Sequence, residues 1–364
     1  MRDMRTKRHL PWALLPALVL ALCLAWLSGP AAAASVTDYH LDGAAVLDAS
    51  GSDYLTQLGA AYQGSGSTAA SYSLSLYEGE LTTSTGSSAA SSGSSANSAT
   101  AAASSTYWWY FNLDDYRVLM PGTATGPYAS YYSFGLGLAS YLPSAYDSAS
   151  AVLGTGNDGY GLINVWLSYA SGDYSAGWYY MGQGLNDITL NLWISGSYAY
   201  FGSVASHETT HLILDHQTDL YNRAGVASSW VTEALAWYVQ ETVYPYGDRN
   251  GYAYNAALLN YYSQNGSLRS DWYGSGGRYN SWIAGEASNL DYVQMQTIGY
   301  FLANSTRGWS AIHDTVGQLA RGLDIDSAFA RAYYGLTTGM HGTASGEGVN
   351  TLYSKYLNYY LGHY

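Results

Sequence analysis

Residues 206–212 read SHETTHL, which places two histidines four residues apart and a glutamate directly after the first histidine. Residues four apart on a helix lie on one face, so a helix here lets His207 and His211 reach one metal ion. Neutral imidazole is a good zinc ligand. A neighbouring carboxylate can accept a proton from water whose pKa the metal lowers to about 7. The pattern therefore predicts a helix that carries a zinc site, with Glu208 as the base.

The alternative interpretation of this segment is a solvated helix face that carries two histidines by chance. The distribution of glutamate in the chain argues against it. The chain has only seven glutamates, yet Glu208, Glu233 and Glu241 all fall within the two helices expected at 198–215 and 229–242. The metal interpretation is therefore favoured.

A catalytic zinc needs a third protein ligand and one open position. The metzincin pattern would supply a histidine six residues after His211, but Leu214 and Gln217 occupy the positions where that pattern needs glycine and histidine. Asp215 lies one turn beyond His211 and suits a hydrogen bond to a ligand better than direct coordination. His216 points to another side of the helix, so we expect it at the surface.

Glu233 is the remaining candidate for the third ligand. It lies in the segment WVTEALAWY (230–238), which is apolar at helical spacing and contains a single carboxylate. A buried lone glutamate is costly unless it is paired or bound to a metal. The alternative is a half-exposed glutamate near a helix start, where the helix dipole favours negative charge. The apolar setting favours the metal ligand.

These segments resemble the gluzincins, the thermolysin-like branch of zinc peptidases, and most closely the bacterial peptidase MA-like domains. In that group H-E-x-x-H is followed about twenty residues later by W-L-x-E-G-x-A-x-Y. Ala234 replaces the usual glycine, and the matching residues are Trp230, Glu233, Ala236 and Tyr238. The resemblance implies zinc bound by His207, His211 and Glu233, with Glu208 as the base. It also implies a zincin-like fold with the active-site helix between a strand-rich and a helical subdomain.

The resemblance continues into residues 291–302, which look like the helix that follows in this group. A tyrosine at the start of that helix donates a hydrogen bond to the oxyanion, and Tyr292 occupies that position. Its alternative role is that of an ordinary half-buried helix tyrosine.

The chain departs from the family pattern at two places. An acidic residue that orients a ligand histidine often follows the third ligand, but Trp237 and Gln240 hold those spacings and Glu241 lies one residue further. The aminopeptidase branch binds the free amino group of its substrate with a G-x-M-E-N strand. The nearest stretch here, residues 182–187 (GQGLND), lacks the glutamate, so cleavage of internal bonds is expected.

Residues 163–169, 177–181 and 188–194 read as strands because β-branched and aromatic residues lie between Gly, Asn and Asp. From residue 198 the apolar spacing becomes helical. The helices expected are 198–215, 229–242, 252–263, 292–304, 310–321 and 325–334. A strand-rich part followed by a helical part predicts an α+β fold, in which 188–194 forms an edge strand open to an extended peptide.

The first 34 residues read as a secretory signal, with a basic start, an apolar stretch and a small-residue cleavage site. An uncleaved membrane anchor is the alternative. Residues 35–106 contain a Ser/Ala/Gly-rich tract from about residue 64 that predicts a linker, either a spacer or the hinge of a pro-segment. The peptidase domain is expected at 107–364. Cys23, the only cysteine, would leave with the signal, so no disulfide is expected.

Charged residues make up only 11% of the chain and the net charge is −13. Nucleic acid and anionic membranes are poor partners for such a surface. The sequence thus predicts a secreted, extracellular zinc metallopeptidase that acts on proteins or peptides, and leaves its oligomeric state open. The alternatives are a non-enzymatic surface protein with a structural or vestigial metal site and a zinc hydrolase of non-peptide bonds. A structural zinc site normally has four protein ligands and no use for Glu208.

Overall fold

The computed structural model describes residues 75–78, 107–123, 125–170, 173–224, 229–245, 251–264, 289–305, 307–334 and 347–362. All of them belong to one unit, residues 38–364. The predicted signal segment and most of the predicted linker lie outside the described residues. None of the described helices is both long and apolar enough to cross a membrane.

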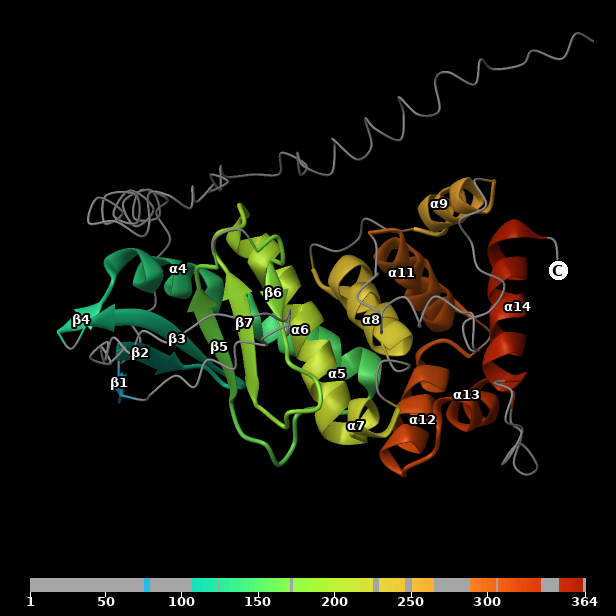
Figure 1. The fold of residues 1–364 in the computed structure, drawn as a ribbon, viewed down its shortest axis with the longest axis horizontal. Coiled ribbons are helices and arrows are strands. Elements are labelled where there is room, and N and C mark those ends of the chain that lie inside the picture. Colours follow the sequence, from blue (N-terminus) through green and yellow to red (C-terminus); the bar gives the residue numbers. More distant parts are fainter. Residues whose placement is uncertain are drawn as a thin grey trace, which may run out of the picture. The chain divides into compact units, whose positions relative to one another are not determined.

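A mixed seven-stranded sheet lies on one side of helix α6 (Tyr198–Thr218), to its left in Figure 1. The strand order is β1-β2-β3-β5-β7-β6, with β4 paired to β3. Strands β3, β5 and β7 run parallel, whereas the other pairs are antiparallel. The strands are β1 (Ser75–Glu78), β2 (Tyr107–Asn112), β3 (Tyr116–Thr123), β4 (Gly126–Pro127), β5 (Ile163–Ser168), β6 (Gly177–Trp178) and β7 (Asp187–Asn191).

One row of apolar side chains crosses the three parallel strands and forms the centre of the core. Val118 of β3 pairs with Val165 of β5, which pairs with Ile188 of β7, and all three are fully buried. Along β5 buried and partly buried residues alternate, as expected for a strand with one face in the core. Behind this sheet α6 packs along β7 and against α5 (Leu142–Leu153).

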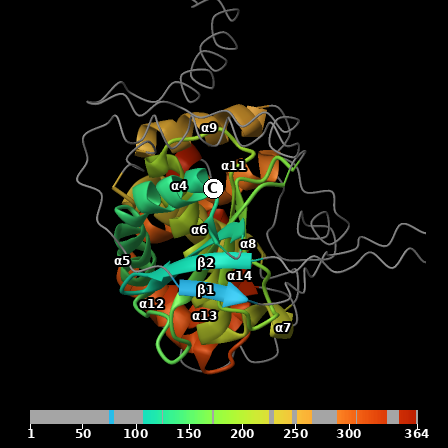
Figure 2. The same ribbon diagram turned by 90° about the vertical axis from the view of Figure 1, so that its left-hand side faces the viewer.

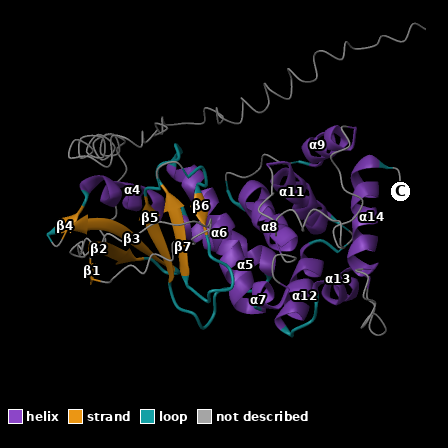
Figure 3. Ribbon diagram, in the orientation of Figure 1, coloured by secondary structure: helices purple, strands orange, loops and turns teal. Residues whose placement is uncertain are grey.

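Helix α4 (Ala129–Ala139) packs against β3, whereas the helices that follow α6 in the chain lie on its far side from the sheet (Figure 3). In the view of Figure 2, β1 and β2 lie nearest the reader. The helices of this part are α7 (Leu220–Ala224), α8 (Ser229–Tyr238), the π-helical turn η2 (Val239–Val243), α9 (Tyr252–Gln264), α11 (Asn289–Asn304), α12 (Trp309–Ala320), α13 (Ile325–Tyr334) and α14 (Glu347–Leu361).

This mixed architecture is compatible with the predicted α+β class, and each of the six predicted helices is present. The part before residue 194 is less strand-rich than expected, because α4 (Ala129–Ala139) and α5 lie between β3 and β5. A parallel strand pair needs such a crossover connection. The signal for α5 was in the sequence: Pro143 lies in its first turn and Gly154, with φ 70°, ends it.

Two expectations about the strands are wrong. The strand β1 lies inside the tract predicted as a linker, where it pairs with β2 in antiparallel register. The segment 188–194 was expected at the sheet edge, but β7 lies between β5 and β6. The edge strand is β6, which is only two residues long and therefore gives a weak sequence pattern.

Candidate metal centre

Helix α6 carries both histidines, and specific residues fix where it begins and ends. The hydroxyl of Ser197 accepts a hydrogen bond from the backbone N–H of Tyr200 at 3.1 Å, which caps the first turn. At the other end Asp219 adopts the left-handed conformation, with φ 49°. The resulting helix has 21 residues, so both histidines lie well inside it.

The middle of α6 is buried although it contains many polar side chains. The hydroxyls of Ser206 and Thr210 donate to backbone carbonyls one turn earlier in the helix. Thr209 bonds the Tyr116 hydroxyl of β3 at 2.8 Å. Because these hydroxyls have partners, their burial does not carry the cost of unsatisfied polar groups. This packing holds the helix firmly against the sheet.

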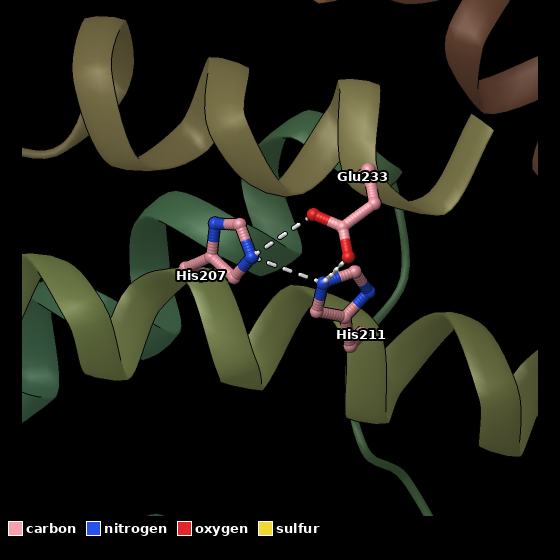
Figure 4. A group of neighbouring side chains, drawn as sticks. All are labelled: His207, His211 and Glu233. Atoms are coloured by element: carbon pink, nitrogen blue, oxygen red, sulfur yellow. Dashed lines mark hydrogen bonds and ion pairs between the residues drawn. The ribbon is translucent and has the colours of Figure 1, made fainter. Parts of the chain in front are cut away.

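The side chains of His207, His211 and Glu233 converge between α6 and α8 (Figure 4). The two Nε2 atoms lie 3.0 Å apart. Glu233 Oε2 lies 3.4 Å from His207 Nε2, and Oε1 lies 3.5 Å from His211 Nε2. All three residues are buried. They lie close enough together to bind one metal ion, and no other His, Cys, Asp or Glu of the described residues joins the group.

The ionisation of the group fits a cation site. Burial alone raises the pKa of Glu233, but the two imidazoles outweigh it and hold that pKa far below its usual range. Burial lowers the pKa of His211, yet the Glu233 carboxylate leaves it above the ordinary value. For Glu208 burial is the largest influence and raises its pKa, against the opposing effect of the two histidines.

Three buried carboxylates lie along this part of the structure: Glu208, Glu233 and Asp215. The sequence has no Lys or Arg between Arg117 and Arg223, and both of these arginines bond groups away from the histidines. Burying carboxylates without a nearby cation is costly. A divalent ion at the histidines would offset this negative charge.

The position of Glu233 depends on how closely α11 approaches α8. A Cβ atom on Gly299 of α11 would overlap the carbonyl oxygen of Ala234. The two helices therefore meet backbone to backbone directly beside Glu233.

The orienting contacts expected for the histidines are not those that the structure forms. Asp215 accepts hydrogen bonds from the Tyr179 hydroxyl and the Gly182 N–H, both at 2.7 Å, rather than from a histidine. The Nδ1 atoms of His207 and His211 are buried and have no hydrogen-bond partner among the described residues. Burial, and then the negative charge of Glu241 in η2, raise the pKa of Tyr200.

His216, expected at the surface, is half-buried and joins two loops. Its Nδ1 lies 2.8 Å from Asn157 Oδ1, its Nε2 lies 3.0 Å from the Leu185 carbonyl, and its ring stacks on Tyr160. Burial lowers its pKa. His216 therefore holds the loop that follows the edge strand and stays apart from the metal-binding group.

The edge strand β6 contributes residues that the sequence analysis missed. A Cβ atom on Gly177 would lie 2.7 Å from a Val204 methyl and 3.3 Å from Glu208 Cγ, so β6 runs directly over the proposed base. The backbone of the neighbouring Tyr179 favours the charged form of the Glu208 carboxylate and so opposes the rise of its pKa on burial. The only local signal was a glycine before aromatic residues (GWYY), which is common in this chain. Tyr292 belongs to α11, but its side chain lies outside the described part of the structure.

In comparisons with protein-family models, with curated proteins and with solved structures, none matched this chain. The function is therefore inferred from the residues of this chain and their geometry alone.

Metal affinity should fall as the pH falls. His211 has a raised pKa in the metal-free protein, so protons compete for its ring nitrogen already above the ordinary imidazole pKa of about 6.5. For each proton that zinc displaces, we expect the dissociation constant for zinc to rise about tenfold when the pH falls by one unit. Titration of the protein with zinc in competition with a chelating dye, between pH 5.5 and 8, measures this dissociation constant. An affinity that does not change over this range would contradict the assignment.

Replacing Gly299 should disturb the metal centre without touching a ligand. Gly299→Ala would push α11 away from Ala234, and we expect a loss of about 1–3 kcal/mol in stability. Glu233 directly precedes Ala234, so the substitution should also displace Glu233 slightly. We expect this displacement to lower zinc affinity roughly tenfold. Gly317→Ala in α12 is the matched control, since a Cβ there meets nothing within 4 Å. Equal zinc affinities in the two variants would refute this role for Gly299.

Proposed function

We propose that this protein is a zinc-dependent metallopeptidase of the gluzincin type, with a zincin-like fold, that cleaves internal peptide bonds. The observation that carries the proposal is the buried His207–His211–Glu233 group with the spare carboxylate of Glu208 beside it. A structural zinc site would need four protein ligands and no base. The predicted signal segment makes secretion part of the same proposal.

The spacing of the three donor atoms supports zinc as the ion. Zinc–ligand bonds of about 2.0–2.1 Å at tetrahedral angles separate neighbouring donor atoms by about 3.3 Å. The two Nε2 atoms lie 3.0 Å apart, and they lie 3.4 and 3.5 Å from different oxygens of Glu233, so that one donor atom from each residue can be chosen with all three within 4.8 Å of one another. Two imidazoles and one carboxylate also match the donor set of a known class of catalytic zinc sites. The three donors would occupy three corners of a tetrahedron and leave the fourth for water or substrate.

A zinc ion held there would polarise a carbonyl group and acidify a water molecule. Glu208 would take the proton from that water and pass it to the leaving amine. In the metal-free protein burial raises the pKa of the Glu208 carboxyl, which favours its holding a proton between the two transfers. Gly177 of β6 lies against the Glu208 side chain and would limit its movement.

The edge strand supports a peptide as the substrate. On the side away from β7, β6 pairs with no other described strand. An extended peptide can add to such an edge through main-chain hydrogen bonds. Gly177 brings this edge against Glu208, so a peptide added there would pass the base and the metal-binding group.

Tyr292 remains the proposed donor to the oxyanion, as the family resemblance implies. It lies seven residues, or two helical turns, before Gly299, the point at which α11 meets α8 beside Glu233. A hydroxyl donor aimed at the developing negative charge is worth roughly 10²–10³ in kcat in other acyl-transfer sites. Tyr292→Phe should therefore lower kcat by that factor and leave zinc bound, and an unchanged kcat would remove Tyr292 from the mechanism.

Substitution of Glu208 separates a catalytic from a structural metal site. We expect Glu208→Gln to bind one zinc ion per chain, as the unaltered protein does, and to lose nearly all hydrolysis of a peptide library. Hydrolysis by the unaltered protein should stop when a chelator removes zinc and return when zinc is added. If Glu208→Gln remains active, Glu208 is not the base. If zinc is bound but the unaltered protein cleaves no peptide, a structural metal site or a non-peptide substrate is favoured.

The ligand assignment is tested by a pair of matched glutamate variants. Glu233→Gln should weaken zinc binding by more than about 100-fold, which exceeds the effect of losing a residue that only supports a ligand. Glu241→Gln, eight residues or about two turns further along the same helical segment, should leave zinc affinity within a few-fold of the starting value. Full zinc occupancy of Glu233→Gln would contradict the assignment.

A further inference from the structure

The edge region at residues 177–179 lies against two acidic residues of α6 that share one face. A Cβ atom on Gly177 would lie 3.3 Å from Glu208 Cγ, and the Tyr179 hydroxyl donates to Asp215 Oδ2 at 2.7 Å. Positions 208 and 215 are seven residues apart, so two helical turns bring them to nearly the same side of the helix. The edge region thus packs against α6 at the proposed base and is hydrogen-bonded to it at a second carboxylate.

Asp215 also fixes the chain just after this attachment. The N–H of Gly182 donates to the same Oδ2 atom at 2.7 Å, so one carboxylate oxygen holds residues 179 and 182 together. Gly182 has a positive φ of 77°, and a Cβ there would lie 2.5 Å from the Tyr221 ring. The turn is therefore closely packed as well as hydrogen-bonded. Burial and the neighbouring Asp215 raise the pKa of Tyr179 well above its usual range, so its hydroxyl keeps its proton and donates.

We propose that Asp215 is a positioning residue that acts through Tyr179, holding β6 and Glu208 in a fixed relation along α6. The inference rests on the proposed peptidase function. Asp215 is not one of the three residues that converge as metal ligands, and its two hydrogen bonds lead to the edge region. Misplacement of a reacting group by about 1 Å can cost on the order of 100-fold in rate. Releasing Tyr179 should therefore impair use of an extended substrate while the metal stays bound.

The test compares Tyr179→Phe with Tyr360→Phe in the full chain loaded with zinc. Each change removes one hydroxyl from a buried tyrosine: Tyr179 donates to Asp215, whereas Tyr360 of α14 donates to the Thr297 carbonyl at 2.9 Å. Asp215→Asn and the double variant Tyr179→Phe/Asp215→Asn complete the set. The readouts are zinc content, kcat and KM for a peptide, and affinity for two probes. Acetohydroxamate reaches only the metal, whereas a peptide hydroxamate also needs the strand edge.

We expect Tyr179→Phe to keep one zinc ion and to bind acetohydroxamate within about threefold of the unaltered protein. Its affinity for the peptide hydroxamate and its kcat/KM should fall about 10- to 100-fold, through KM as well as kcat, because the strand edge and the base lose their fixed relation. Tyr360→Phe should change neither value by more than a few-fold. The double variant should be no worse than Asp215→Asn, since both residues act through one hydrogen bond.

The inference is overturned if Tyr179→Phe behaves like Tyr360→Phe towards the peptide hydroxamate, or if the losses in the double variant simply add. It is also overturned if both probes weaken equally, because the defect then lies at the metal. An unaltered zinc protein that neither cleaves peptides nor binds the peptide hydroxamate would instead refute the peptidase function. If the unaltered protein is active but the variants do not behave as expected, only the inference fails, so the two failures are distinguishable.

Discussion

The carboxylate of Glu233 is buried, with its two oxygens within 3.5 Å of two imidazole nitrogens, and α11 packs closely against the helix that carries it. An isolated buried carboxylate would be costly, and nearby positive charge removes that cost. Without a metal the histidines supply this charge only when protonated, whereas a bound divalent ion supplies it at neutral pH. The close contact between α8 and α11 at Gly299, and the burial of α6 against the sheet, both maintain this convergence.

Charged residues are few throughout the chain, so each buried carboxylate has a larger share in the electrostatics of the protein. The segment from Val118 to Asn222 contains no Lys or Arg. The Tyr179 hydroxyl donates a hydrogen bond to the buried carboxylate of Asp215, and the Tyr116 hydroxyl bonds Thr209 of the same helix. Tyr116 of β3 and Tyr179, which directly follows β6, thus connect these strands to the helix that carries the histidines.

The sequence predicted that His207, His211 and Glu233 would lie close together, from helix spacing for the two histidines and from its apolar setting and the family resemblance for Glu233. His207 and His211 share a face by their spacing, and Glu233 was the only carboxylate in an apolar helical segment. The helical part could be predicted for the same reason, since the apolar spacing repeats over more than ten residues at a time. The zincin-like fold and the peptidase activity remain proposals.

The sequence predicted a strand at 177–181, and β6 is the two-residue part of it that forms. Its place at the sheet edge and its attachment to α6 could not be predicted, because they depend on contacts with residues distant in sequence, such as its pairing with Leu190 and Thr189. Asp215 was expected near a histidine because helical spacing allows it, but the Tyr179 hydroxyl and the Gly182 N–H compete for the same oxygen. Helix α4 was missed because its sequence, ASYYSFGLGLA, has no charged residue and two glycines.

The most direct test of this account is a crystal structure of the zinc-loaded protein with anomalous data collected at the zinc edge. The account predicts one ion about 2.0–2.2 Å from His207 Nε2, His211 Nε2 and a Glu233 oxygen, with no fourth protein ligand and with Glu208 beside the open position. An ion bound elsewhere, or held by four protein ligands, would contradict it.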